Sequence, residues 1–129
     1  MTSNGEIDIH LKNHILFITV LGSCDVQIFK QSFDRIKNII SEKPTGEFSI
    51  IVDLTHWELN ESEVKMEFED IRPWLIEHGQ KYEVLAVGQS NFKKLESMKY
   101  FLGFDDSLSV HYCATVNEGK EWLKTNHML

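Results

Sequence analysis

The loop and helix start at residues 56–70 hold the side chains best suited to bind or react. His56 lies within a few positions of the carboxylates of Asp53 and Glu58, and imidazole and carboxylate groups are ordinary ligands for zinc or iron. One nitrogen donor, in a spacing that matches no established ligand pattern, does not make a metal site. We therefore expect no metal and no cofactor. The candidates for contact with a partner or ligand are Asp53, His56, Trp57, Glu58, Glu61 and Glu63.

Acidic residues dominate the same segment, with six between Glu58 and Asp70 against the single basic Lys65. Carboxylates near the start of a helix are favoured by the helix dipole, so one interpretation is a solvated helix face. The functional interpretation is a docking surface at residues 56–70 for another protein that carries a basic surface.

Ser62 is a candidate phosphoacceptor, because we expect its hydroxyl in the first turn of a helix. A phosphate added there would meet backbone N–H groups and the positive end of the helix dipole. Serine is also favoured at helix starts for capping alone. The alternative interpretation is therefore an exposed serine with a purely local role.

Trp57 lies in a predicted loop that follows a strand, at the strand's carboxyl end. Open α/β sheets tend to place their ligands in that region. An alternative function is therefore the binding of a small apolar or lipid-like ligand in a pocket near this loop.

The familiar catalytic signatures are missing from the sequence. It contains no G-x-S-x-G, P-loop, G-x-G-x-x-G, H-E-x-x-H or C-x-x-C pattern, so we expect no catalytic residue and a protein that is not an enzyme. Cys24 precedes a predicted helix start, where the dipole can favour a thiolate. Without a resolving cysteine or a nearby base, we predict a buried cysteine with a packing role.

Length and composition describe an ordinary globular chain. Its 129 residues suit one domain spanning residues 1–129. A net charge of −7 would repel a phosphate backbone, so nucleic acid is not an expected partner. The longest apolar run, at 15–21, is too short for a membrane span, and the first residues lack the pattern of a signal peptide. We expect a cytoplasmic protein.

Apolar spacing predicts about five strands. Ile7, Ile9 and Leu11 alternate with polar residues, which is typical of a strand with one wet face. A tight hairpin leads from it to a second, more buried strand at 15–21. Nearly continuous apolar runs predict further strands at 48–54, 82–87 and 108–113.

About four helices alternate with these strands. Their predicted starts lie at Ser23 or Asp25, at Asn60, at Asn91 and at Thr115. Pro73 is expected to kink or restart the second helix.

Apolar side chains at helical spacing are expected to face the core. In the third helix these include Phe92 and Leu95, and in the last helix they are Val116, Trp122 and Leu123.

The predicted order is ββαβαβαβα, an α/β fold. A strand that follows a helical crossover runs parallel to the strand before it. The expected fold is therefore a mixed sheet whose first strand is antiparallel and whose remaining strands are parallel. The apolar sheet edge favours a homodimer.

This order, with the segments IIVDL at 50–54, LAVG at 85–88 and GKEWL at 119–123, resembles the SpoIIAA-like superfamily, which includes the STAS domains. The resemblance covers nearly the whole chain, from Ile7 to Leu123. It implies a non-catalytic regulatory or protein-interaction domain of a bacterial kind.

In STAS-type anti-sigma-factor antagonists, a phosphorylated serine in an Asp-Ser-Ser-Gly-Leu motif follows the corresponding strand. By that resemblance, Ser62 occupies the phosphoacceptor position. The sequence then departs from the motif, with Glu63, Val64 and Lys65 in place of Ser-Gly-Leu, and a neighbouring glutamate repels a phosphate. The sequence is more similar to the plainer STAS/SEC14-like branch of the superfamily.

Overall fold

The computed structural model describes residues 5–43, 46–58, 64–101 and 109–126. Its elements are β1 (Glu6–Lys12), β2 (Ile15–Leu21), α1 (Val26–Glu42), β3 (Phe48–Asp53), α2 (Val64–Glu77), β4 (Gln80–Ala86), α3 (Asn91–Phe101), β5 (Ser109–Cys113) and α4 (Val116–Asn126). The predicted order ββαβαβαβα is confirmed.

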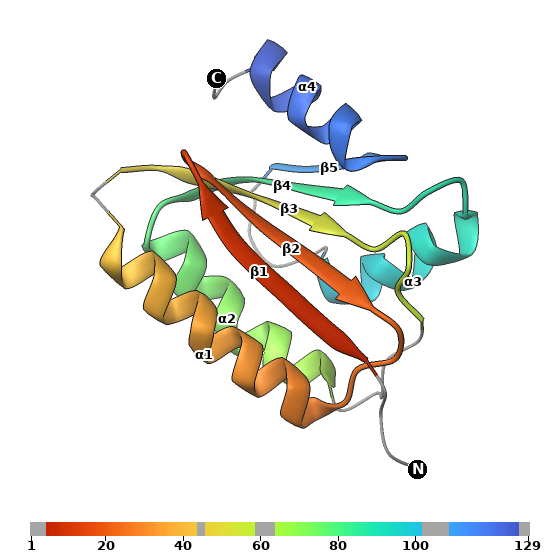
Figure 1. Ribbon diagram of the computed structural model, residues 1–129, viewed down its shortest axis with the longest axis horizontal. Helices are drawn as coiled ribbons and strands as arrows, with labels where there is room; N and C mark the ends of the chain where they lie inside the picture. The colour runs from red at the N-terminus through yellow and green to blue at the C-terminus, as the bar shows by residue number, and fades with distance from the viewer. Residues whose placement is uncertain (1–4, 44–45, 59–63, 102–108, 127–129) are drawn as a thin grey trace.

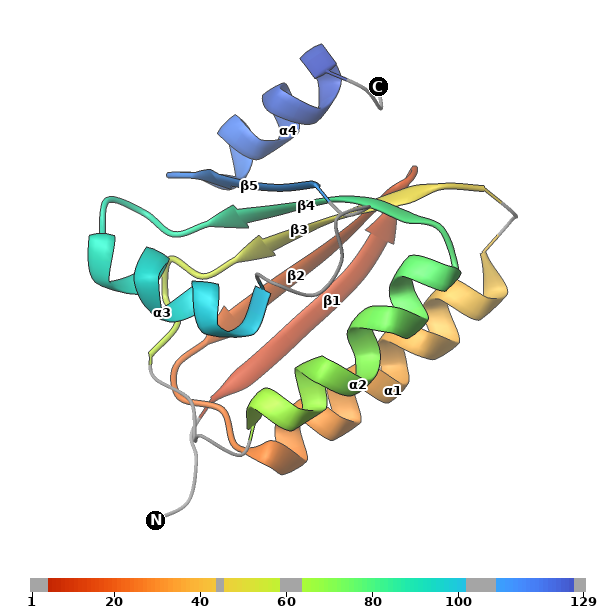
Figure 2. The same ribbon diagram turned by 180° about the vertical axis from the view of Figure 1, so that it is seen from behind.

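The strands form one mixed sheet in the order β1-β2-β3-β4-β5. β1 runs antiparallel to β2, and each later pair is parallel, as predicted. α1, α2 and α3 lie on one side of the sheet and α4 lies on the other (Figures 1 and 2). The carboxyl ends of β2, β3, β4 and β5 therefore lie at the same end of the sheet, which we call the carboxyl edge.

A two-residue turn joins the antiparallel strands. Lys12 pairs with Ile15, so Asn13 and His14 make the whole connection. Asn13 has φ 57°, a left-handed conformation that asparagine tolerates better than most residues. This turn fixes the register of β1 on β2.

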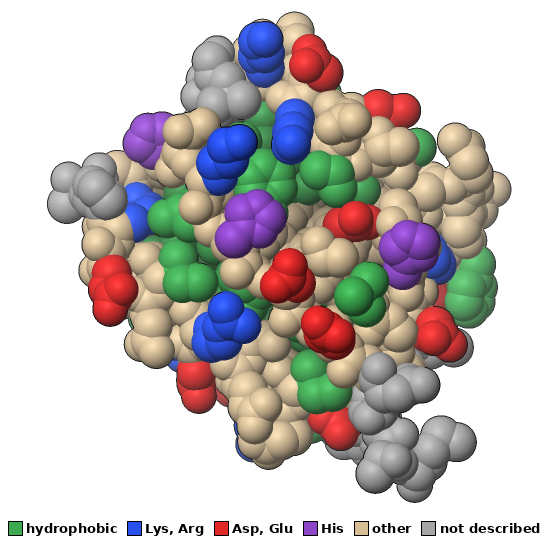
Figure 3. All heavy atoms as spheres, viewed as in Figure 1, with side chains coloured by type: hydrophobic (Ala, Val, Ile, Leu, Met, Phe, Trp, Pro, Cys, Tyr) green, Lys and Arg blue, Asp and Glu red, His purple; other side chains and the backbone are tan. Residues whose placement is uncertain are grey.

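Each face of the sheet carries a hydrophobic core. The larger core lies against α1 and α2 and includes the fully buried Leu16 and Leu85. The smaller core lies against α4 and includes Ile51, Val84 and Leu123. α4 contacts β3, β4 and β5. In Figure 3, hydrophobic side chains lie next to basic, acidic and histidine side chains on the face of the molecule in view.

Capping side chains fix three of the helix starts. Asp25 caps α1 by accepting a hydrogen bond from the Ile28 N–H (2.9 Å). α3 begins at Asn91 as predicted, and Ser90 caps it by accepting one from the Lys93 N–H (3.1 Å). Thr115 caps α4 as predicted, because its hydroxyl oxygen accepts a bond from the Glu118 N–H (3.1 Å).

Pro73 was predicted to kink or restart the second helix, and the restart does not occur. α2 continues through Pro73 to Glu77, because buried residues before and after the proline, Phe68, Ile71 and Leu75, hold the helix on the sheet. In α4, Trp122 packs against the smaller core as predicted but is only half-buried, while Leu123 is fully buried. Leu123 is therefore the main anchor of α4.

No helix among the described residues is long and apolar enough to cross a membrane.

Candidate functional site

Backbone hydrogen bonds tie the loops of the carboxyl edge together. The Gly22 N–H donates to the carbonyl oxygen of His56 (3.0 Å), and the Glu58 N–H donates to that of Gly22 (2.9 Å). The Lys93 ammonium group, at the start of α3, donates to the carbonyl oxygen of Thr55 (2.6 Å). The loops after β2 and β3 and the first turn of α3 therefore form one connected surface.

Asp53 holds the loop that follows β3. Its Oδ1 accepts hydrogen bonds from the backbone N–H (3.0 Å) and the hydroxyl (2.6 Å) of Thr55. This is a side-chain-to-backbone turn of the kind that aspartate favours. Asp53, predicted to bind a partner or ligand, is thus engaged in shaping the loop.

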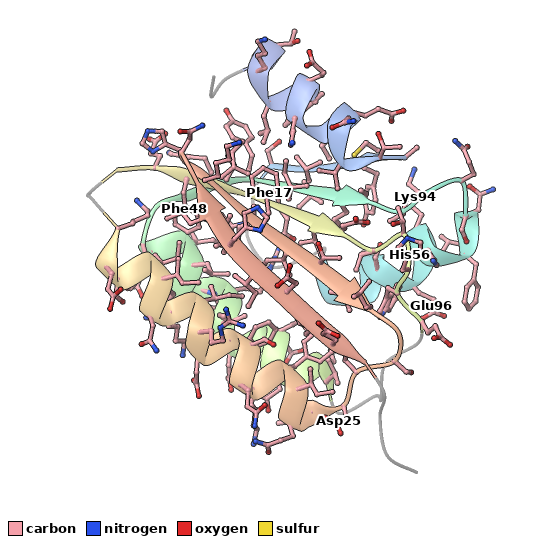
Figure 4. All side chains as sticks on the ribbon, in the orientation of Figure 1. Phe17, Asp25, Phe48, His56, Lys94 and Glu96 are labelled. Atoms are coloured by element: carbon pink, nitrogen blue, oxygen red, sulfur yellow. The ribbon has the colours of Figure 1, made fainter. Side chains whose placement is uncertain are left out.

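His56 and Glu58 are exposed, and both use their backbone groups to bond Gly22. Their side chains are consequently available at the surface while their backbones are fixed. Figure 4 places His56 at the same end of the molecule as Lys94 and Glu96 of α3.

Trp57 lies in the core, with 4% of its surface exposed. It lines an apolar cavity of about 40 Å³ between the sheet and helices α1 and α2. A cavity of this size has room for one or a few waters, whereas pockets for drug-sized ligands have volumes of roughly 300–1,000 Å³. Trp57 is therefore buried in the core, and its role in partner or ligand binding stays a prediction.

A buried ion pair lies at the wall of this cavity. Arg72 of α2 donates a hydrogen bond to Oε1 of Glu83 in β4, and these side chains are only 2% and 1% exposed. Gln80 Nε2 donates to the same oxygen (3.0 Å). Paired charges are the usual form in which ionised groups are buried. The pair joins α2 to β4, and sequence spacing alone gave no sign of it.

Glu61, Ser62 and Glu63 lie outside the described residues, so their predicted roles stay predictions. The described part of the acidic segment includes the exposed residues Glu69 and Asp70. No group of three or more His, Cys, Asp or Glu side chains in the described ranges could hold a metal ion.

Large hydrophobic side chains are exposed near the starts of α2 and α3, two of the helices that leave this edge. Met66 of α2 is 69% exposed, and Phe92 and Leu95 of α3 are 58% and 64% exposed. The prediction that Phe92 and Leu95 face the core is wrong. α3 rests instead on the face that carries the buried Ser97 and the half-buried Lys93. Residues 92 and 95 lie roughly opposite that face on a helix.

Neither cysteine has the environment of a reactive thiolate. Cys24 is 2% exposed, as predicted, and burial raises its pKa from 9.0 to about 11. Burial, with a contribution from the charge of Glu118, likewise raises the pKa of Cys113 to about 11. Both thiols are therefore protonated near neutral pH.

No family model and no curated protein matches this sequence. Three solved structures are similar over most of the chain. An uncharacterized protein of the DUF3478 family with a SpoIIAA-like fold, from Shewanella loihica, matches with TM-score 0.65 at 15% identity, covering 95% of this chain and 98% of its own.

The anti-sigma factor antagonist SpoIIAA in its unphosphorylated form matches with TM-score 0.63 at 15% identity, covering 92% of this chain and 97% of its own. An anti-sigma factor antagonist from Mycobacterium paratuberculosis matches with TM-score 0.59 at 14% identity, covering 94% and 95%. At these identities the likeness concerns the fold. The chain therefore has the SpoIIAA-like fold that its sequence predicted.

Proposed function

We propose that this chain is a non-catalytic regulatory domain that binds another protein through the carboxyl edge. The docking surface comprises His56, Glu58, Met66, Phe92 and Leu95, and we call it the carboxyl-edge surface. It overlaps the segment 56–70 and adds the start of α3.

The exposure of Met66, Phe92 and Leu95 carries this proposal. They are the large hydrophobic side chains exposed in the described ranges, and all three lie near the starts of α2 and α3. These helices follow the neighbouring parallel strands β3 and β4, so both begin at the carboxyl edge. Exposed apolar groups that gather near one edge and are surrounded by polar residues are typical of protein interfaces.

Charged residues provide a rim around these apolar groups. Lys65, Glu69 and Lys94 are exposed on the same two helices. The segment 56–70 has an excess of carboxylates, so the partner is expected to present basic residues toward α2. Charge complementarity of this kind increases the association rate and the selectivity of binding.

The similar structures support a regulatory role as an analogy. Two of them are named anti-sigma factor antagonists, and such a name denotes action on another protein. Fold similarity alone does not transfer a function. The analogy supports the proposal because a role in binding another protein agrees with the exposed hydrophobic side chains of this chain.

Affinity capture from extracts of the native cell tests the proposal. We expect a partner that wild-type protein retains and that F92S/L95S loses. N38A, on the exposed surface of α1, is the control and should retain the partner. Equal retention by F92S/L95S would contradict docking through the carboxyl-edge surface.

A second comparison tests the charge of the partner. E69K/D70K should reduce capture, and added salt should weaken the wild-type complex, because both changes reduce attraction to a basic surface. E42K/E77K, at the exposed last residues of α1 and α2, is the matched charge control and should leave capture unchanged. Capture that is insensitive to salt and to E69K/D70K would contradict a basic partner.

Ser62 remains a proposed phosphoacceptor. Phosphorylation there would add negative charge two residues before the start of α2 in the sequence. Phosphopeptide analysis of protein from its native cell, under several growth conditions, should find the modification. Its absence under all of them would contradict the phosphoswitch without affecting the docking proposal.

The alternative function, binding of a small apolar or lipid-like ligand, has one favourable observation, the apolar cavity beside Trp57. Its volume of about 40 Å³ favours the interaction role instead. Native mass spectrometry of freshly purified protein distinguishes them, because a retained lipid would appear as a defined added mass.

A further inference from the structure

β1 is an edge strand with one side of its backbone directed away from the sheet. It pairs only with β2 in the described sheet. An unpaired strand edge is a template for another strand, which proteins either block or use.

The register of the sheet identifies which backbone groups of β1 face outward. The Ser49 N–H of β3 donates to the carbonyl oxygen of His14 (2.9 Å), just before β2. The even-numbered residues of β2 therefore direct their backbone N–H and C=O groups toward β3. The odd-numbered residues of β2 therefore bond toward β1. Their partners on β1 are Glu6, Asp8, His10 and Lys12.

The backbone N–H and C=O groups of these four residues form hydrogen bonds with β2 inside the hairpin. Hydrogen-bonded and non-hydrogen-bonded pairs alternate along antiparallel strands. The N–H and C=O groups of Ile7, Ile9 and Leu11 consequently point outward from the edge. A strand that pairs with β1 must bond to these three residues.

The sequence of β1, EIDIHLK, is complementary to itself when two copies run antiparallel. With Ile9 opposite Ile9 of a second copy, Glu6 lies opposite Lys12, and Asp8 lies opposite His10. Every acidic side chain thus meets a basic one. In the same register, Ile7, Ile9 and Leu11 meet only one another, so all outward backbone groups find partners.

We propose that two copies of this chain associate through β1, antiparallel and centred on Ile9, and form one continuous sheet across a two-fold axis. The four charged or ionisable residues Glu6, Asp8, His10 and Lys12 are exposed in the chain and share one face. In the dimer they occupy non-hydrogen-bonded pairs, where side chains lie closest. Opposite charges there stabilise the pairing.

Neighbouring registers are less favourable for identifiable reasons. Centring on Asp8 places two aspartates opposite each other. Centring on His10 places two histidines opposite each other and leaves Glu6 beyond the paired segment. Like charges directly opposite one another destabilise strand pairing. The register centred on Ile9 is the one that uses all seven residues of β1.

The pairing also covers apolar surface. Ile7 and Leu11 are half-buried in the chain, and each gains an apolar neighbour from the second copy. Removal of apolar surface from water stabilises the association. The pairing uses β1, whereas the proposed docking surface lies on α2, α3 and the loop after β3, so the two proposals are independent.

Sedimentation equilibrium over a concentration series extending into the millimolar range tests the dimer. Wild-type protein should show a monomer–dimer equilibrium. E6K places Lys12 opposite a second lysine, and K12E places Glu6 opposite a second glutamate. Each variant should weaken dimerisation by about tenfold or more, because two attractive pairs become repulsive.

Two combinations make the test specific for the register. E6K/K12E restores both pairs and should regain wild-type association. An equimolar mixture of E6K and K12E should form a heterodimer, detectable by native mass spectrometry, because each variant supplies the charges that the other lacks. Glu6 and Lys12 lie at opposite ends of β1, so contacts within one copy do not explain such rescue.

The matched controls are E121K and K124E on the exposed part of α4, which should dimerise like wild type. Circular dichroism checks that each variant keeps its fold. A wild-type chain that stays monomeric throughout the series would overturn the proposal. Equal dimerisation of E6K and wild type would overturn it too, as would absence of the heterodimer.

Discussion

Side chains at the carboxyl edge divide into those that fix the loops and those that remain available. Asp53 belongs to the first group because its carboxylate accepts two hydrogen bonds from Thr55. His56 and Glu58 belong to the second, since only their backbones are bonded to Gly22. Mutations at these positions should therefore separate stability from binding.

Replacing Asp53 with alanine should lower the free energy of unfolding by about 1–2 kcal/mol, because both hydrogen bonds to Thr55 are lost. Glu58→Ala should change it by less than about 0.5 kcal/mol, as is usual for an exposed side chain. Urea unfolding monitored by circular dichroism measures both. Equal effects of the two variants would contradict the assigned role of Asp53.

Cys24 should make stability depend on pH in the alkaline range. Burial raises its pKa from 9.0 to about 11 in the folded chain, so the folded state holds the proton more tightly than the unfolded state. The stabilisation is full below pH 9 and is lost as pH rises toward 11.

The free energy of unfolding, followed across this pH range, should fall less steeply in C24A than in wild type. Iodoacetamide should also label Cys24 slowly at neutral pH, because the thiol is buried and protonated. Rapid labelling in the native state, or identical pH slopes in both proteins, would show that the thiol is accessible.

At the scale of elements, apolar spacing identified the strands and helices and the buried face of α4, but not the buried face of α3. Phe92 and Leu95 recur at helical spacing, which normally predicts a core-facing stripe. α3 turns them outward because Lys93 bonds to Thr55 and Ser97 is buried. That orientation depends on contacts with a loop distant in sequence, which a local pattern does not contain.

Trp57 is the converse case, because a residue predicted to lie in a loop is buried in the core. It was predicted in a loop that binds a partner or ligand, yet the backbone bonds between Gly22 and residues 56 and 58 turn its ring into the core. The antiparallel first strand and the parallel later strands were predictable, because they follow from element order and crossover rules. The roles of Glu61, Ser62 and Glu63 remain predictions.

Removing one partner of the Arg72–Glu83 pair, which joins α2 to β4, should cost more stability than removing both. Glu83→Leu alone leaves the guanidinium group buried beside a cavity wall and should lower the free energy of unfolding by about 3–5 kcal/mol. The double variant R72M/E83L removes both charges and should recover a large part of that loss. A double variant less stable than Glu83→Leu would contradict this account.

In α4, Leu123→Ala should destabilise the chain by about 2–5 kcal/mol, because Leu123 is fully buried. Trp122→Ala should have the smaller effect, since Trp122 is half-buried and packs on the rings of Tyr82 and His111. Thermal unfolding compares the two variants. The reverse order of melting temperatures would show that Trp122 is the anchor.

At the scale of the whole molecule, the fold separates two surfaces. The carboxyl edge collects loops and helix starts from three successive crossovers, whereas β1 is the first strand in the order of the sheet and forms its lateral edge. In the two proposals made above, this chain, which has the SpoIIAA-like fold, binds a partner protein at the carboxyl-edge surface and a second copy along β1. Variants at one surface should leave the other function intact.

Site-specific photocrosslinking tests the docking claim most directly. A benzophenone amino acid in place of Phe92, compared with the same group at Asn38 on α1, is irradiated in the native cell. We predict one defined crosslinked protein from position 92, absent from position 38 and abolished by L95S. Crosslinks that are identical at both positions, or a partner that attaches only at position 38, would contradict the carboxyl-edge surface as the docking site.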